Sequence, residues 1–143
     1  GGKSLPIETG THVPFIANWK GKIEQGQVNS NLVGFSDILP TIADAINTRI
    51  PDSVKVDGVS FYNQLLGRKG PVREWVYSHY DDGKGSFEGA TYVHNKKWKL
   101  YRNGELYNID KDPLEKNPIY EEQMTKAMKQ EKQELQAVLD SLK

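Results

Sequence analysis

The sequence lacks cysteine altogether, and this absence removes several kinds of chemistry from its 143 residues. Disulfides, thiol nucleophiles and zinc sites built on thiolates are excluded. An excess of positive charge is also missing, because 19 basic and 19 acidic residues cancel, so the basic stripe of a nucleic-acid binder is not expected. No run of about 18 apolar residues occurs, which predicts that no segment spans a membrane. With 36% hydrophobic and 27% charged residues, the composition is that of a folded globular piece.

The first half of the chain is poor in segments that could pair into a sheet. Residues 13–19 (VPFIANW) are apolar at successive positions, which predicts a strand buried on both faces, as inside an α/β sheet. No good partner strand follows nearby, so its neighbours are expected outside this chain. A helix is predicted over 36–47, with Ser36 as its N-cap and one apolar face. A short helical turn is expected over 60–66, ended by Gly67.

The second half has the short β-prone runs of an antiparallel sheet. Asn103-Gly104 is the strongest hairpin signal, because tight hairpin turns need positive φ at their central positions. Asn95-Lys96 predicts another tight turn. Residues 121–142 carry apolar side chains at helical spacing, which predicts a long helix across one face of the sheet. The β-prone runs themselves are 75–80, 90–95, 97–101 and 105–109.

Together these elements predict an α+β fold. A small antiparallel sheet of about four strands would pack on the long C-terminal helix, and residues 71–143 would form this subdomain. Residues 1–70 would supply a loop, a strand, a helix and a connecting loop that complete a larger α/β domain in a parent protein. Because the chain opens on Gly1 and not on methionine, a cut or processed start is expected.

Isolated residues carry little functional signal. His12, His79 and His94 show no i, i+4 pairing and no carboxylate at metal-ligand spacing, so no metal site is expected in this chain. His94 is best interpreted as structural, whereas His12 and His79 flank predicted strands and are better candidates. Gly2-Lys3-Ser4 matches only the end of a P-loop, and Pro6 would break the helix that must follow. No serine lies in a Gly-x-Ser-x-Gly elbow.

Four stretches of the sequence carry motifs that are informative together. They are 2–15 (GKSLPIETGTHVPF), 36–42 (SDILPTI), 57–67 (DGVSFYNQLLG) and 98–115 (WKLYRNGELYNIDKDPLE). In this order they are similar to the patterns Gly-Lys-x-x-x-x-Glu-Gly-Gly-x-Arg-x-Pro, Asp-Leu-x-Pro-Thr, Asp-Gly-x-Ser…Leu-Leu-x-Gly and Tyr-Lys-Leu…Glu-Leu-Tyr-Asp-Leu…Asp-Pro-x-Glu. These are patterns of the sulfatase (arylsulfatase) family, within the alkaline phosphatase superfamily, which the chain therefore resembles. Each pattern alone is weak, but four in the right order are strong. Thr9 and His12 stand where glycine and arginine are usual, which leaves the substrate open.

The resemblance implies that the chain is the C-terminal portion of a sulfuric ester hydrolase. Such enzymes use a formylglycine nucleophile made within Cys/Ser-x-Pro-x-Arg and a calcium ion held by Asp and Asn residues. Neither motif occurs here, so both groups are expected in the N-terminal catalytic part, and the fragment alone is expected to be inactive. Lys3 matches the family lysine that contacts the sulfate, and His12, His79 and Tyr80 are expected near the substrate pocket. A sulfated small molecule or glycan is the expected partner, and a periplasmic or secreted location is expected.

Two other functions stay open at this point. A phosphoester or phosphonate hydrolase of the same superfamily would share much of the pattern, although the stretch around Lys3 favours a sulfatase. A non-catalytic carbohydrate-binding module could use the three Trp, seven Tyr and four Phe residues as a sugar-binding face. Aromatic side chains more often fill the core of a small sheet.

Overall fold

The computed structural model describes residues 5–81 and 89–142. The chain divides into two compact units, of which the first joins the segment up to Pro14 with the residues from Trp75 onward. The second unit runs from Phe15 to Glu74. The expected division of a parent enzyme into domains at about residue 70 concerns a longer protein and stays a prediction.

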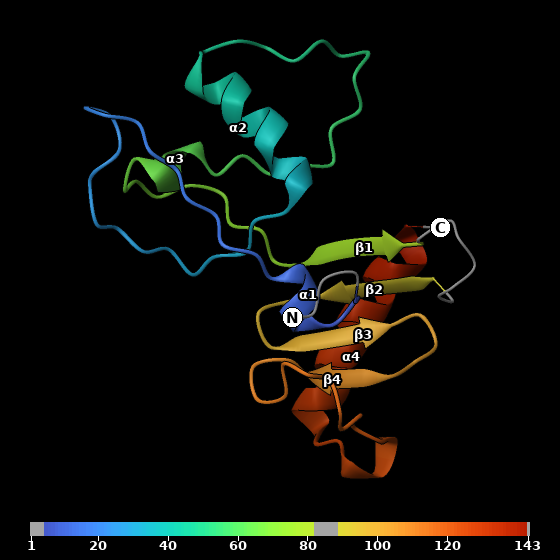
Figure 1. Cartoon of the computed structure of the whole chain (residues 1–143). Helices are drawn as coiled ribbons and strands as arrows, with labels where there is room; N and C mark the ends of the chain where they lie inside the picture. The colour runs from blue at the N-terminus through green and yellow to red at the C-terminus, as the bar shows by residue number, and fades with distance from the viewer. Residues whose placement is uncertain (1–4, 82–88, 143) are drawn as a thin grey trace. The chain divides into compact units, whose positions relative to one another are not determined.

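The first unit contains a four-stranded antiparallel sheet, which confirms the predicted fold class. The strands follow one another in sequence order across the sheet, and each pairs antiparallel with the next (Figure 1). A helix, α4, packs on the sheet, as the apolar spacing of the C-terminal segment predicts. The elements are β1 (Val76–Tyr80), β2 (Ala90–His94), β3 (Trp98–Tyr101), β4 (Leu106–Asn108) and α4 (Lys126–Ser141).

The tight turns of the sheet lie where the sequence places them. Asn95 forms the turn before β3 by accepting hydrogen bonds from the backbone N–H groups of Lys97 and Trp98 on its side-chain oxygen. At the next turn only Gly104 has positive φ, at 93°, and its N–H donates to the Tyr101 carbonyl. The loop is therefore a three-residue connection with glycine in the left-handed position, and not the two-residue Asn-Gly turn that the dipeptide suggested.

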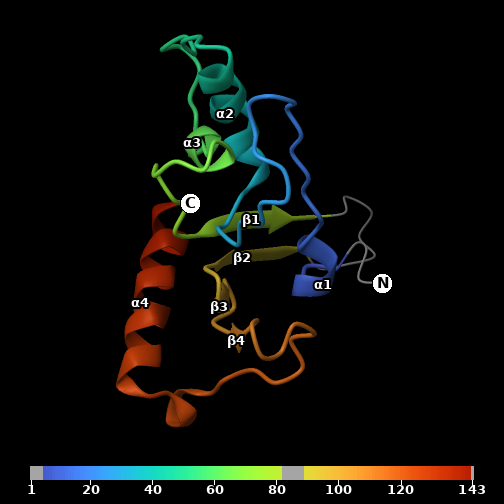
Figure 2. The same ribbon diagram turned by 90° about the vertical axis from the view of Figure 1, so that its left-hand side faces the viewer.

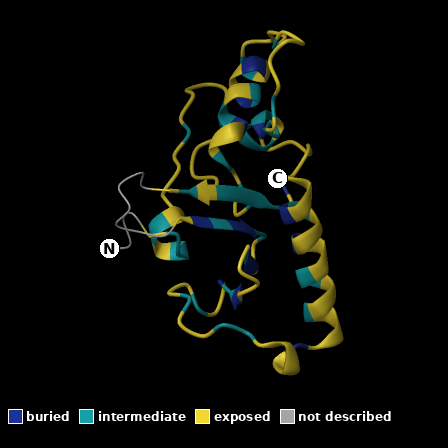
Figure 3. Ribbon diagram, turned by 90° about the vertical axis from the view of Figure 1, so that its right-hand side faces the viewer, coloured by how far each residue is buried: buried dark blue, intermediate teal, exposed yellow. Residues whose placement is uncertain are grey.

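The two faces of the sheet differ in character. On one face of the sheet, alternate strand residues pack against α4. This helix begins after its N-cap Thr125 and buries Leu135 and Leu139. The short helix α1 (Glu8–Thr11) covers the opposite face, and Figure 2 shows α1 and α4 on the two sides of the sheet. Buried residues lie on the strands and on the side of α4 turned toward them (Figure 3). The apolar core under α4 consists of Val93, Trp98, Leu100, Leu106, Met124, Leu135 and Leu139.

The second unit is built around a buried ion pair between Asp37 and Arg73. The 3-10 turn η1 (Phe35–Asp37) leads into α2 (Ile38–Ala45), and the short α3 (Tyr62–Leu65) ends before Gly67, which has φ of 67°. Ser36, expected to cap the helix, does not do so: its hydroxyl lies 3.3 Å from Arg73 Nη2. The prediction of this cap is wrong because Arg73, far away in the sequence, binds the start of the helix.

The predicted strand over 13–19 does not form. Val13, Phe15 and Ile16 are all more than half exposed, with Ile16 88% exposed. An extended segment becomes a strand only by pairing with a neighbour, and no described part of this chain offers that edge. Because its sheet partners are expected outside this chain, pairing of this segment within a longer protein stays a prediction.

Candidate functional site

The main candidate residue, Lys3, lies outside the described residues. The structure begins to describe the same motif at Leu5 and shows it entering α1. Glu8 Oε1 lies 2.8 Å from His12 Nδ1, one helical turn away. The His12 side chain is 76% exposed, so this hydrogen bond is a solvated surface contact whose net stabilisation is small.

A buried polar cluster lies on the sheet face that α1 covers. It is centred on Lys99 of β3, whose Nζ lies 2.9 Å from Glu115 Oε1. The two side chains are 0% and 2% exposed. Tyr101 donates its hydroxyl hydrogen to Glu115 Oε2 at 2.5 Å, and the Tyr92 ring centre lies 3.9 Å from the Lys99 ammonium. The cation therefore has a carboxylate on one side and an aromatic face on another, both of which favour the charge.

The same cluster reaches the segment that follows Lys3 in the sequence. Lys99 Nζ also donates to the Pro6 carbonyl oxygen. Glu115 Oε1 accepts a second hydrogen bond, from the backbone N–H of Glu8, at 2.8 Å. Within the described residues no buried side-chain nitrogen or oxygen is without a hydrogen-bond partner. The cluster is thus satisfied by the chain itself and leaves no buried polar group waiting for a ligand.

Titration of the cluster is strongly perturbed. Burial lowers the pKa of Lys99, although the hydrogen bond and charge of Glu115 act in the opposite direction. Burial and then the hydrogen bond to Glu115 raise the pKa of Tyr101 far above its usual range. Burial, with the neighbouring Glu105, raises the pKa of Tyr107 to about 12. None of these tyrosines is a source of protons near neutral pH.

Glu115 reaches the sheet from an ordered loop. Its φ is 51°, a left-handed conformation that non-glycine residues seldom adopt. The side chain of Asp112 organises this loop by accepting hydrogen bonds from the backbone N–H groups of Lys116 and Asn117, both at 2.8 Å. The Asp-Pro-Leu-Glu motif therefore has a physical reason: its first residue builds the turn and its last residue binds the buried lysine.

His79 and Tyr80 are not brought together on one surface. They are neighbours on β1, so they point to opposite faces of the sheet. His79 Nδ1 lies 2.7 Å from Thr91 Oγ1, its cross-strand partner. Their proposed place near a substrate pocket stays a prediction. His94 behaves as a structural residue, because burial lowers its pKa and its Nδ1 lies 3.0 Å from the Asn95 carbonyl oxygen.

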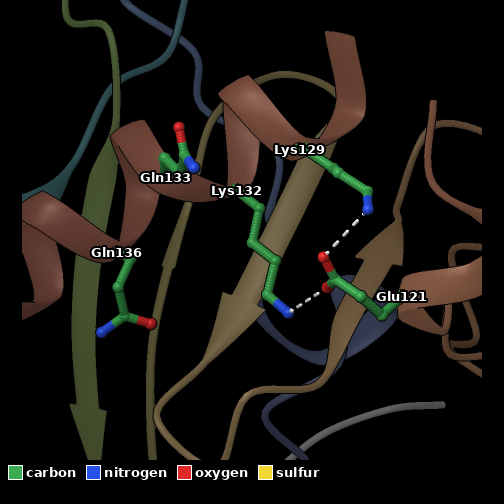
Figure 4. Close-up of a pocket in the computed structure, with 5 residues that line it drawn as sticks. All are labelled: Glu121, Lys129, Lys132, Gln133 and Gln136. Atoms are coloured by element: carbon green, nitrogen blue, oxygen red, sulfur yellow. Dashed lines mark hydrogen bonds and ion pairs between the residues drawn. The ribbon is translucent and has the colours of Figure 1, made fainter. Parts of the chain in front are cut away.

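No metal centre is found among residues 5–81 and 89–142, where no three His, Asp or Glu side chains converge. No helix in this part of the chain is both long and apolar enough to cross a membrane. A hollow between η2 (Glu121–Gln123) and α4 is lined by two lysines, but both bind Glu121, at 3.3 Å from Lys129 and 3.4 Å from Lys132 (Figure 4). These two cations lower the pKa of Glu121 and are already matched by it. The hollow is a solvated surface and not an anion site.

Comparison with known proteins decides the family. Residues 2–141 match the family described as N-sulphoglucosamine sulphohydrolase, C-terminal. The chain belongs to this family. It is similar to an ulvan-active sulfatase of Formosa agariphila, at 28% identity over 71% of this chain and 21% of that protein. An arylsulfatase of Clostridium perfringens is 30% identical over 79% of this chain and 24% of that protein. A solved 2-O GAG sulfatase, BT1596, has a TM-score of 0.54 and 26% identity, over 73% of this chain and 23% of that one.

The family match and these similarities show that the chain is the C-terminal portion of a sulfatase, as the four motifs predict. It spans less than a quarter of the length of these three sulfatases. In the sequence, Lys99 and Glu115 belong to one of the family motifs, and no local pattern indicates that these two residues bind each other. Successive side chains of β3 point to opposite faces of the sheet, so the sequence pattern alone would place Lys99 opposite the apolar face and in contact with solvent. In the structure Lys99 is buried, and its ammonium binds the Pro6 carbonyl oxygen and the Glu115 carboxylate.

Proposed function

We propose that this sulfatase C-terminal portion belongs to an enzyme that hydrolyses the sulfate ester of a glycan or an aryl alcohol. The observation that carries the proposal is the family match over residues 2–141. Lys3 lies within this range, and the stretch around it resembles the family motif that holds the sulfate-contacting lysine. Relatives named as arylsulfatases and one named as ulvan-active support both kinds of substrate. A phosphoester hydrolase of the same superfamily has less support, because these relatives are sulfatases.

Lys3 would act on the ester by charge stabilisation. As the S–O bond of a sulfate ester breaks, negative charge grows on the sulfuryl and leaving-group oxygens. An ammonium group fixed beside those oxygens stabilises the transition state more than the ground state. Lysine suits this role because it is a compact cation with three N–H donors. The remaining chemistry requires groups that this chain does not offer.

The formylglycine and calcium that the family implies do not fit the described residues. The sequence holds no cysteine and no Ser-x-Pro-x-Arg, and no metal-binding cluster is found among residues 5–81 and 89–142. We assign both groups to an N-terminal catalytic part, which is the partner that this portion must join. No reaction step can be built on this chain alone.

The apolar surface of the second unit supports such a partner. Phe35, the α2 residues Leu39 and Ile42, and the α2 C-cap Ile46 are each more than half exposed, and Phe35 is 90% exposed. Large exposed apolar patches mark surfaces that bind other protein segments. In the enzyme we propose, this face and residues 13–19 would be covered by the α/β catalytic domain, which would also supply the missing strand partner.

The test uses the intact protein with an aryl sulfate and the matching aryl phosphate. We expect sulfate release with the sulfate ester, and Lys3→Ala should lower kcat at least about 100-fold, the scale of losing one charge-stabilising donor. Lys20→Ala, which removes an exposed lysine of the second unit, is the control and should leave kcat within about twofold. A Lys3→Ala rate within a few-fold of wild type would remove Lys3 from the site, and preference for the phosphate ester would favour the phosphoester hydrolase.

The chain alone tests the remaining alternative. We expect the 143-residue chain to show no turnover of an aryl sulfate, since it lacks the nucleophile. Calorimetry with a panel of sulfated glycans then distinguishes the two functions. Tight binding by the chain alone would favour a carbohydrate-binding module over a catalytic portion.

A further inference from the structure

The buried pair of Lys99 and Glu115 is not required by the apolar core of the sheet. It lies on the face opposite the cluster of apolar side chains under α4. Taking two charges out of water costs free energy that their attraction only partly offsets, and apolar residues of similar volume are often as stabilising. A reason other than stability is therefore expected for this pair.

The pair holds two backbone groups of one segment. Lys99 donates to the Pro6 carbonyl oxygen, and Glu115 accepts from the Glu8 N–H at 2.8 Å. The contacts join residues 93 and 107 positions apart in the sequence. They fix the chain on both sides of Ile7, the N-cap of α1. The direction in which the chain enters α1 is thus set by two side chains from the sheet and its loop.

Two opposite charges suit this task better than apolar side chains. A carbonyl oxygen needs a donor and an N–H needs an acceptor, and an ammonium and a carboxylate supply one each with capacity left to bind each other. An apolar pair of equal volume would fill the space but leave both backbone groups without partners. The left-handed backbone at Glu115 shows that the loop accepts an unfavourable conformation to place this carboxylate.

We propose that Lys99 and Glu115 form a positioning pair for the active-site segment, which they hold at Pro6 and Glu8, three and five residues after Lys3. The inference rests on the proposed sulfatase function, in which Lys3 meets the ester. The pair touches no substrate and acts only through the backbone. Positioning at this level matters, because a misplacement of about 1 Å can cost about 100-fold in rate.

The experiment compares two variants of the intact protein. Lys99→Met with Glu115→Leu removes both charges while keeping the volume of the interior, so the fold is expected to persist. Leu135→Ala is the control: it leaves a cavity in the core under α4 and destabilises the sheet from that face, without touching the N-terminal segment. Amide hydrogen exchange at Glu8 and at Leu100, and kcat and KM with an aryl sulfate, are measured for both.

We expect the double variant to speed amide exchange at Glu8 by about tenfold or more, while the exchange rate at Leu100 changes far less. We also expect it to lower kcat by about tenfold or more, with KM nearly unchanged. Leu135→Ala should leave exchange at Glu8 and kcat close to wild type. Unchanged exchange at Glu8 in the double variant, or an equal fall of kcat in both variants, would overturn the proposal. A wild-type protein without sulfatase activity would overturn the proposed function instead, and exchange at Glu8 would still decide whether the pair holds this segment.

Discussion

Replacing Asp37 by asparagine should be among the most damaging single changes in the second unit. Its carboxylate is 1% exposed and accepts four hydrogen bonds. Two come from the backbone N–H groups of Gly34 and Val59, both at 2.7 Å, and two from the Arg73 guanidinium, one of them at 2.8 Å. The carboxylate thus joins the start of α2, the segment after Gly58 and the end of the unit.

The magnitude of the loss depends on the groups that asparagine cannot satisfy. It keeps one oxygen, so half of the acceptor capacity is replaced by an N–H₂ group that faces other donors. Arg73 keeps contacts to the Ser36 hydroxyl at 3.3 Å and the Asp57 carbonyl at 3.2 Å but loses its counter-charge. Removing one partner of a buried ion pair costs about 3 to 5 kcal/mol. With a urea dependence of about 2 kcal/mol/M, the unfolding midpoint should fall by about 2 M.

The assay is urea unfolding followed at the backbone amide signals of Val59 and Phe61, which report on the second unit alone. Asp37→Leu with Arg73→Met should lose less stability than the sum of the two single changes, because neither charge is then left buried without the other. A loss below about 1 kcal/mol for Asp37→Asn, or additive single changes, would refute the reasoning that this pair organises the unit.

The pH dependence gives a second check on the same group. Burial alone would raise the pKa of Asp37, but hydrogen bonds from Arg73, Gly34 and Val59 outweigh it and hold the pKa below the usual 3.8. The unfolded chain therefore binds the proton first as pH falls. The stability that the ionised carboxylate contributes is present above pH 3.8 and is lost as pH falls through the folded pKa. The difference between wild type and Asp37→Asn should shrink over that range.

Two further predictions concern single positions. A Cβ at Gly58 would lie 2.0 Å from the Ser36 carbonyl oxygen. Gly58→Ala should therefore destabilise the second unit by about 3 kcal/mol or more, measured as a lower midpoint of urea unfolding. A loss of stability within experimental error would contradict the close approach. Burial lowers the pKa of His94 below 6.5, so the unfolded state binds its proton first and stability should fall as pH drops from 6.5 toward the folded pKa. Thermal unfolding between pH 7 and 5 should show a weaker pH dependence for His94→Gln, and an equal dependence would exclude His94 as the cause.

The parts of the fold with local signals could be predicted from the sequence. The four strands, the turn at Asn95 and the stop at Gly67 depend on residues within a few positions of each other. The long helix was predicted from 121, but regular α-helix begins only at Lys126, because residues 121–123 form a 3-10 turn and Thr125 is the N-cap of α4. Boundaries of this kind are set by capping, which competes with an apolar pattern that extends further.

The parts that failed depend on residues far apart in the chain or outside it. Ser36 looked like a cap because nothing near it in the sequence announces Arg73. Residues 13–19 carry the composition of a buried strand, yet a strand needs an edge to pair with. The contact between Lys99 and Glu115 also joins segments that no local pattern connects. The proposed places of Lys3, His12, His79 and Tyr80 near a substrate pocket stay predictions.

The four family motifs are connected in pairs, because a charged residue of one motif binds the backbone of another. In the first unit the motif at 98–115 supplies Lys99 and Glu115, and these two residues bind the backbone of the motif at 2–15. In the second unit the motif at 36–42 supplies Asp37, which binds the backbone of the motif at 57–67 through the N–H of Val59. Each unit therefore joins two motifs through one buried ion pair that also binds backbone groups.

Such an arrangement explains why the motifs combine charged residues with glycine and proline. A buried carboxylate or ammonium that binds backbone groups specifies the path of a chain segment, since its hydrogen bonds are directional where apolar contacts are not. Gly58 permits the same chain path, because its backbone passes so close to the Ser36 carbonyl oxygen that no side chain would fit. If the two pairs serve to fix chain paths, then replacing either by apolar residues should leave a folded unit whose bound segment exchanges its amides faster. Unchanged exchange at both Glu8 and Val59 in such variants would show that packing alone sets these paths.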